Sequence, residues 1–359
     1  MLIFINITIS VKQIWCVERL YINIREYYGD ILMKIISTIV RKGIREVDDT
    51  VTKVVNARLA NFNERPIGTL GDTFAKSPKA ETFTDFSKKI AGIQSGDDLI
   101  ILAQEFKKLD LYDTMKQELI SQYVSKYESF YNQLYAGKTF EPKVLFKQIF
   151  GKDLSNEAAQ TLSDKYKAIL AEPDFNNFLK ELHAQVKKDF GLDYIDSRLD
   201  IIFQKGRDIG FTGGSSNFLD FIRIRFFEDN PLNRRKAFEL MIHELNHMKQ
   251  GEISFATNTR EYINVLANAR GCSPLDISKI IGGQKIYDIK QKFGEIQEGS
   301  PLYNLGMRYI ESAKNYFSPK GDFTAEKFLA YKRQFNEAES YAAQDRAGEL
   351  FYFLTGNSI

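Results

Sequence analysis

The sequence predicts a mainly α-helical protein with a small β-sheet, an α+β fold, and three observations support this prediction. Apolar residues recur every three or four positions over residues 46–60, 97–135 and 154–190, which is the spacing of amphipathic helices. After Gly191, two short runs rich in β-branched and aromatic residues are typical of strands. Of the 359 residues, 43% are hydrophobic and 27% are charged, which is the composition of a globular protein with a substantial core.

Residues 1–190 are predicted to form a helical N-terminal region. Within it, residues 61–95 carry several prolines and glycines and are expected to be a connecting stretch. The helical block over residues 154–190 is expected to break near Pro173. His183 follows in this block among Lys, Gln and Glu residues, so we expect it on the surface, without partners for catalysis.

The N-terminal residues argue against a secretory signal peptide and against a membrane-spanning segment. Residues 1–11 are apolar, but they lack basic residues and a small-residue cleavage site, and they are too short to span a bilayer. We therefore expect neither a Sec signal nor a transmembrane segment. Met33 opens a stretch that resembles a protein start, so we treat residues 1–32 as a hypothetical upstream extension.

The charged residues argue against a nucleic-acid-binding protein, and the cysteines argue against a disulfide or a thiolate zinc site. Forty-nine Lys and Arg residues are interspersed with 47 Asp and Glu residues and leave a net charge of +2, so no basic face for nucleic acid is expected. Cys16 and Cys272 are far apart and outside any CxxC spacing. We expect two free thiols rather than a disulfide or a thiolate zinc site.

The sequence pattern changes in residues 191–359, where strand-like runs first appear. LDIIF at residues 199–203 and FIRIRFF at residues 221–227 are predicted strands, with a Gly-Gly-Ser-Ser loop at residues 213–216 between them. A capped helix should follow. Asn230 suits the N-cap, Pro231 suits the first helical position, and Gly251 is the expected stop, which predicts a helix over residues 231–250.

This helix carries His243-Glu244-Leu245-Asn246-His247, an HExxH motif. Side chains four residues apart on a helix lie on one face, where two imidazoles can hold one zinc ion and the Glu can act as general base. The predicted core stripe of the helix is on nearly the opposite side, so we expect the histidines to face a cleft. The stripe consists of Phe238, Met241, Ile242, Leu245 and Met248.

A catalytic zinc ion takes three protein ligands, and the third is expected to be a carboxylate. No histidine follows His247, His183 belongs to another region, and Cys272 lies beside a helix-ending Gly271. The best candidate motif is Asn-Glu-Ala-Glu-Ser at residues 336–340, within a predicted last helix.

The two motifs together resemble the gluzincins, the thermolysin-like zinc metallopeptidases in which a downstream helix completes HExxH, often with NEAxSD. The resemblance implies a zincin-like catalytic domain over residues 191–359, with Glu337 as the third zinc ligand. Glu339 and Glu261 are the alternatives. Tyr341 stands where the family pattern has an Asp that supports a ligand histidine. The 89 residues between His247 and Glu337 exceed the family's spacing, so an additional helical insertion is expected.

The expected activity is zinc-dependent hydrolysis of peptide bonds, with Glu244 as general base. Because no later histidine is present, the group that stabilises the oxyanion should be a tyrosine or an arginine, with Tyr341, Tyr262 and Arg333 as candidates. Such a domain behind a helical region is the layout of bacterial effectors and toxins that act on one protein.

Two further expectations concern the substrate and the alternatives. If residues 221–227 form an edge strand, a peptide could pair with it, and Arg223 and Arg225 would favour acidic segments or only protect the edge. The competing functions are a non-catalytic zincin-fold interaction protein, which would have no use for Glu244, and a zinc amidase acting on cell-wall peptides.

Overall fold

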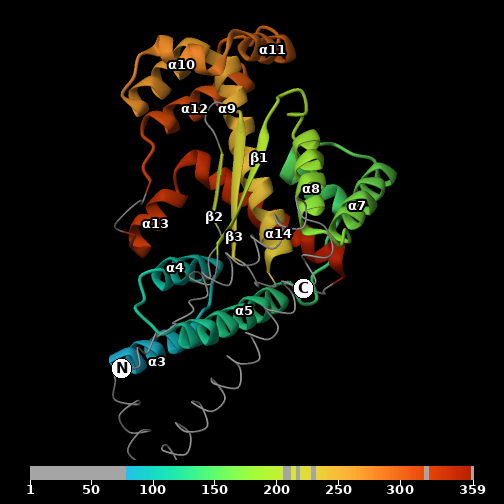
Figure 1. The fold of residues 1–359 in the computed structure, drawn as a ribbon. Coiled ribbons are helices and arrows are strands. Elements are labelled where there is room, and N and C mark those ends of the chain that lie inside the picture. Colours follow the sequence, from blue (N-terminus) through green and yellow to red (C-terminus); the bar gives the residue numbers. More distant parts are fainter. Residues whose placement is uncertain (1–77, 205–211, 216–218, 228–231, 319–322, 357–359) are drawn as a thin grey trace, which may run out of the picture. The chain divides into compact units, whose positions relative to one another are not determined.

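The computed structural model describes residues 78–204, 212–215, 219–227, 232–318 and 323–356. The chain divides into two compact units, residues 1–77 and residues 78–359, and all described residues belong to the second. The predicted helix at residues 46–60, the hypothetical extension and Cys16 lie outside the described residues. The described part is mainly helical with one small sheet, which confirms the predicted fold class (Figure 1). None of its helices is both long and apolar enough to cross a bilayer.

The first described helices are α3 (Pro78–Ala91), α4 (Gly96–Phe106) and α5 (Asp113–Tyr135), which share a hydrophobic core of their own. α3 lies in the stretch predicted to be a connection, so that prediction was wrong there: Phe86 and Ile90, one turn apart, bury the inner face of a helix. Ser95 starts α4 with a capping box, in which its hydroxyl accepts from the Asp98 amide and the Asp98 carboxylate accepts from the Ser95 amide.

Next come α6 (Pro142–Phe150), α7 (Asn156–Leu170) and α8 (Phe175–Asp189), and the break near Pro173 is confirmed. The prediction that His183 lies on the surface was wrong, because its side chain is only 9% exposed. Leu179, Leu182 and Val186 of α8 are fully buried, and His183 falls in the same stripe at helical spacing.

The described strands form a sheet in the order β1–β3–β2, from β1 (Arg198–Gln204), β2 (Thr212–Ser215) and β3 (Phe221–Phe227). β3 pairs in parallel with β1, with Leu199 opposite Ile222, and antiparallel with β2, with Ser215 opposite Ile222. Both predicted strands are confirmed, but the loop predicted at residues 213–216 was wrong for residues 213–215, which belong to strand β2, and Ser216 lies outside the described residues. β3 is the central strand of the described sheet rather than an edge, because it pairs with β1 on one side and with β2 on the other, and its two isoleucines, Ile222 and Ile224, are fully buried.

The long helix α9 (Asn233–Arg270) packs against β2, β3 and α14, and it carries the HExxH motif (Figure 1). The predicted cap at Asn230 and Pro231 lies outside the described residues. The helix does not stop at Gly251 as predicted. It continues to a kink at Asn258, whose backbone is non-helical, and ends at Gly271 in a left-handed conformation with φ 64°.

Gly251 lies inside α9 because Leu219 packs closely against the helix backbone at this position, and the chain makes no turn there. A Cβ atom there would lie 3.0 Å from Cδ2 of the buried Leu219. The predicted core stripe of this helix is confirmed, since each of its five side chains is at most 1% exposed.

The remaining helices are α10 (Pro274–Ile281), α11 (Gly283–Phe293), α12 (Pro301–Lys314), α13 (Ala325–Lys332) and α14 (Phe335–Thr355). α10 to α12 supply the expected helical insertion and pack on α9. The single last helix that was predicted is two helices, α13 and α14, because the chain leaves helical geometry at Gln334. One hydrophobic core joins α6–α8, the sheet, α9–α12 and α14, so the predicted division at residue 191 lies inside this core.

A buried charge cluster lies where α9 begins. The Arg235 side chain is 1% exposed, its Nε donates to Glu239 Oε1 at 2.7 Å, and its guanidinium lies 4.0 Å from the centre of the Tyr131 ring. Lys236 also donates to Glu239, through Oε2, at 2.7 Å. The cluster joins α5 to the helix that carries the HExxH motif.

Candidate metal centre

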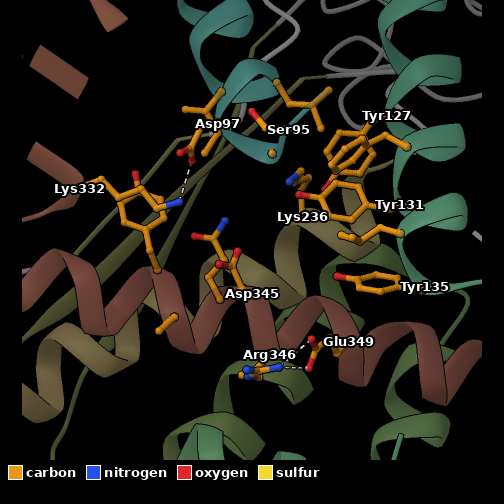
Figure 2. Close-up of a pocket in the computed structure, with 18 of the residues that line it drawn as sticks. Ser95, Asp97, Tyr127, Tyr131, Tyr135, Lys236, Lys332, Asp345, Arg346 and Glu349 are labelled. Carbon is orange, nitrogen blue, oxygen red and sulfur yellow. Dashed lines mark hydrogen bonds and ion pairs between the residues drawn. The ribbon is translucent and has the colours of Figure 1, made fainter. Parts of the chain in front are cut away.

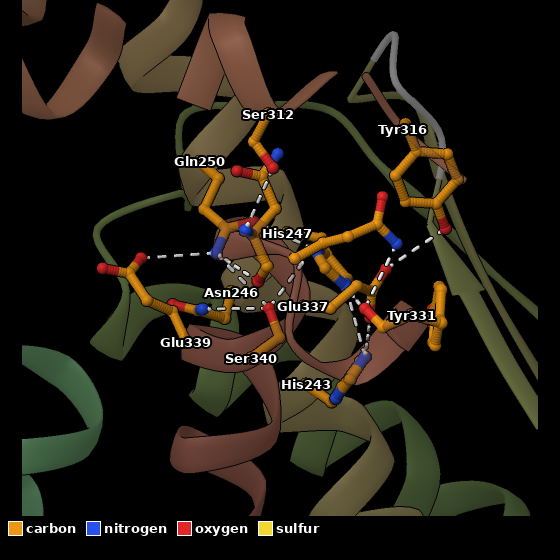
Figure 3. Close-up of polar contacts among 12 residues, drawn as sticks. His243, Asn246, His247, Gln250, Ser312, Tyr316, Tyr331, Glu337, Glu339 and Ser340 are labelled. Atoms are coloured by element: carbon orange, nitrogen blue, oxygen red, sulfur yellow. Dashed lines mark hydrogen bonds and ion pairs between the residues drawn. The ribbon is translucent and has the colours of Figure 1, made fainter. Parts of the chain in front are cut away.

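The two histidines of the motif lie one turn apart on α9 and point toward the first turn of α14 (Figure 3). Their ring centres are 4.8 Å apart, and Nε2 of His243 lies 3.2 Å from Nε2 of His247. His243 is 5% exposed. Each ring therefore presents the same nitrogen to one point.

Glu337 on α14 brings a carboxylate to this point. Its Oε2 lies 3.7 Å from Nε2 of His243 and 3.4 Å from Nε2 of His247. The side chain is 2% exposed, yet Oε2 has no hydrogen-bond partner, while Oε1 accepts from the Tyr316 hydroxyl at 3.1 Å. Buried carboxylate oxygens are normally satisfied, so this atom lacks a partner that a cation would supply.

The donor set fits a metal ion. The ligand atoms of His243, His247 and Glu337 all lie within 4.8 Å of one another. In the part of the chain that the structure describes, no other group of three or more His, Cys, Asp or Glu side chains meets in this way. Two imidazoles and one carboxylate are a ligand set typical of catalytic zinc.

The electrostatics of the cluster are strongly coupled. Burial disfavours the charged form of Glu337, but the two imidazoles outweigh it and lower the pKa of this carboxyl well below its usual range. Burial likewise disfavours protonation of His247, but Glu337 outweighs it and raises the pKa of His247 to about 9. The carboxylate thus favours a positive charge at the Nε2 atoms, which a bound cation would supply.

Neutral side chains orient His247. Its Nδ1 lies 2.9 Å from Gln250 Oε1 and 3.2 Å from Ser340 Oγ, and the amide nitrogen of Gln250 donates to the Asn336 carbonyl at 2.9 Å. Because that bond fixes the amide, Oε1 faces the imidazole and Nδ1 carries the hydrogen. The lone pair of Nε2 is thereby directed at the cluster. Asn246 donates to Ser340 Oγ at 3.1 Å and holds the hydroxyl in place.

Glu244, beside the first histidine, lines the same cavity, which has a volume of about 440 Å³. Burial raises the pKa of Glu244, and the charge of Glu337 adds to this, while both histidines and a hydrogen bond with Ser215 of β2 act in the opposite direction. A carboxyl with a raised pKa next to a metal cluster is suited to accept and return a proton.

Comparison with protein-family models, curated proteins and solved structures finds no match.

The alternative carboxylate ligands lie elsewhere. Glu339 turns away from the histidines, and its Oε2 accepts from the Tyr309 hydroxyl at 2.6 Å. Glu261 follows the kink of α9 and pairs with Lys314 at 2.9 Å. The structure therefore brings Glu337 alone of the three candidates to the histidines.

The candidate oxyanion donors are spread around the site. Tyr341 packs its ring edge-on against His243, with centres 4.8 Å apart, but it lines a second cavity rather than the one that holds Glu244. Tyr262 does line the metal-site cavity, and Arg333 is exposed and does not. Tyr316 and Tyr331, which sequence reasoning missed, both line it.

The second cavity, of about 480 Å³, lies between α4, α5 and α14. Figure 2 shows Tyr127, Tyr131 and Tyr135 of α5 on one side, with charged side chains of α14 opposite. Its ion pairs, Lys332 with Asp97 and Arg346 with Glu349, are satisfied at 2.7 Å. This cavity brings no further His, Glu or Asp to the metal cluster.

Some of the missed residues carried a signal and others did not. Gln250 is three positions after His247 and Ser340 three after Glu337, so helical spacing places each on the face of its ligand. Tyr316 follows α12 and Ser215 belongs to a Gly-rich strand, and nothing in their local sequence indicates the site.

Proposed function

We propose that this protein is a zinc-dependent metalloendopeptidase of the gluzincin type. The observation that carries the proposal is the unpartnered, buried Glu337 Oε2 facing the Nε2 atoms of His243 and His247. No hydrogen bond satisfies this oxygen in the described residues, although both imidazoles present the same nitrogen to it at 3.4 and 3.7 Å, as ligands around a shared cation do. Glu244 in the same cavity favours an enzyme over a binding protein, since binding alone needs no base.

Zinc held by these three side chains would supply a Lewis acid that activates water and polarises a peptide carbonyl. Glu244 is the residue that we assign to proton transfer. It takes a proton from the attacking water and returns it to the leaving amine. Glu244 and Ser215 both line the cavity, which places the carboxyl beside the proposed ligand His243.

A tyrosine hydroxyl would stabilise the oxyanion. The Tyr316 hydroxyl donates a hydrogen bond to Glu337 Oε1 at 3.1 Å, so it lies next to the proposed ligand carboxylate. Tyr331 packs beside it, with ring centres 6.1 Å apart. We therefore assign oxyanion stabilisation to Tyr316 first, whereas Tyr341 acts on His243 by packing against it.

The peptide would approach along β2. This strand is at the edge of the described sheet, pairs with β3 on one side only, and brings Ser215 to the cavity. Its free backbone groups can pair with an extended chain. β3 cannot serve in this way because both of its sides are occupied, and Arg223 is engaged with Asp200 at 3.1 Å.

The test combines metal analysis with cleavage mapping. Purified wild type and Glu244→Gln should each contain about one zinc ion per chain, whereas His243→Ala should contain little. Proteome-wide mapping of new N-termini should find cleavage by the wild type that is absent with Glu244→Gln. Wild type free of metal after zinc loading, or equal cleavage by both proteins, would contradict the proposal.

A further inference from the structure

The cavity at the metal centre continues beyond the ligands. Past His247 it is lined by Val265, Leu266 and Ala269 of α9, all after the kink, and by Ala313 of α12. Tyr262 completes this wall, and we call these five residues the inner pocket. Four of the five are aliphatic, so the pocket suits an apolar stem.

Gly251 connects the metal centre to the inner pocket. It lies one helical turn after His247, and a Cβ atom on it would be 3.6 Å from the hydroxyl oxygen of Tyr262. The Tyr262 hydroxyl therefore lies over the α9 backbone directly beyond the ligand turn. The absence of a side chain at Gly251 lets both Leu219 and this hydroxyl pack close to the α9 backbone.

The Tyr262 hydroxyl has no partner among the described residues. Tyr262 is 6% exposed, its ring packs edge-on against Phe255 with centres 4.7 Å apart, and its hydroxyl makes no hydrogen bond within the described residues. The oxygen atom itself is not fully buried, so it is accessible from the cavity. A hydroxyl that lines a cavity without a hydrogen-bond partner is available to a ligand.

Tyr262 is also separate from the reacting centre. The Tyr316 hydroxyl donates to Glu337 Oε1 at 3.1 Å, whereas no hydrogen bond joins Tyr262 to Glu337 or Glu244. Its expected function is recognition rather than oxyanion stabilisation.

We propose that the inner pocket binds a neutral substrate side chain with an apolar stem and a hydrogen-bonding end, of which glutamine is the type, and that Tyr262 determines this specificity. The inference rests on the proposed function. The charged residues that line the cavity, Glu244 and Glu337, belong to its metal end, so a glutamate or lysine end would enter the inner pocket without a counter-charge. Methionine would fill the pocket but leave the hydroxyl unbonded.

The test uses three sets of degenerate peptides whose central residue is Gln, Met or Glu, which are similar in length. Binding to zinc-loaded Glu244→Gln, which should not turn peptides over, is measured by fluorescence anisotropy. We expect Gln peptides to bind about tenfold more tightly than Met peptides, and Glu peptides to bind weakest. Adding Tyr262→Phe, which keeps the ring packing on Phe255, should reduce the Gln-over-Met preference to less than about twofold.

The control is Tyr287→Phe, the same change at a tyrosine of α11 that is 56% exposed, which should leave the preference intact. Equal binding of Gln and Met peptides, a preference that survives Tyr262→Phe, or tightest binding of Glu peptides would overturn the inference. Selective binding without hydrolysis by the wild type would count against the peptidase and leave the pocket assignment standing. Hydrolysis without glutamine selectivity would support the peptidase and contradict the pocket assignment.

Discussion

Replacing Glu337 by glutamine tests the metal centre most directly. The side chain is 2% exposed, and its Oε2 lies 3.4 and 3.7 Å from the two imidazole nitrogens. Glutamine keeps the shape but replaces an anionic donor by a neutral amide. Changes to groups that merely support a ligand already weaken metal binding about 10- to 100-fold, so losing a ligand should cost about 100-fold or more in zinc affinity.

This loss converts into a shift in stability. A ligand that binds only the folded state stabilises it by RT ln(1 + [L]/Kd). At a free zinc concentration of about 1,000 times the wild-type Kd, the wild type gains about 4.1 kcal/mol, whereas a variant with about 100-fold weaker binding gains about 1.4 kcal/mol. The difference of about 2.7 kcal/mol corresponds to roughly 4 °C in Tm, because an unfolding entropy of about 2.1 cal/mol/K per residue amounts to about 0.75 kcal/mol/K for 359 residues.

The assay is thermal unfolding of wild type and Glu337→Gln with zinc and with a chelator. Glu339→Gln is the matched control, because the same change two residues later on α14 removes a carboxylate that bonds to Tyr309 instead. Its zinc-induced shift in Tm should equal that of the wild type. If Glu337→Gln shows the full wild-type shift, the carboxylate is not a ligand, and the reasoning from its unpartnered oxygen fails.

Three further predictions concern stability. Burial lowers the pKa of His183 from 6.5 to about 4, so the unfolded state binds more protons between these values and stability falls as the pH drops through this window. Between pH 7 and 5 the loss should be about 2 kcal/mol, and His183→Gln should remove it from urea-unfolding data; an unchanged pH dependence would contradict the burial of a neutral ring. Gly306→Ala should destabilise the protein by about 2 kcal/mol, because a Cβ atom there would lie 2.6 Å from Cβ of Thr257. The control Gly283→Ala, which places no atom within 4 Å of the new Cβ, should be neutral or stabilising. Equal effects of the two variants in guanidinium unfolding would refute the close contact of α12 with α9. Glu239→Gln should cost about 3 kcal/mol or more, since it leaves the buried guanidinium of α9 without its counter-charge, and a loss of less than about 1 kcal/mol would show that this pair is not closed to solvent.

The metal cluster could be predicted from sequence because its information is local. The four-residue step of His243 and His247 depends only on helix geometry, and the motif around Glu337 identified one carboxylate among several. The helices could likewise be predicted from apolar residues that recur every three or four positions, and β3 from apolar residues that alternate with polar ones.

Features that depend on tertiary contacts could not be predicted. Gly251 has the composition of a helix stop, but Leu219 packs against it and the helix continues. Whether β3 is an edge or a centre depends on β2, whose glycines carry little strand propensity. The burial of His183 followed from the apolar stripe of α8, and the polar neighbours in sequence concealed it.

The kink at Asn258 separates two tasks along a single helix. The ligand histidines precede it, and Tyr262 together with most of the inner pocket follows it, beside helices α10 to α12. In the proposed peptidase, substitutions beyond the bend would therefore change substrate selection while the proposed ligands and base stay as they are. One short stretch of a single helix would then determine the target independently of the chemistry.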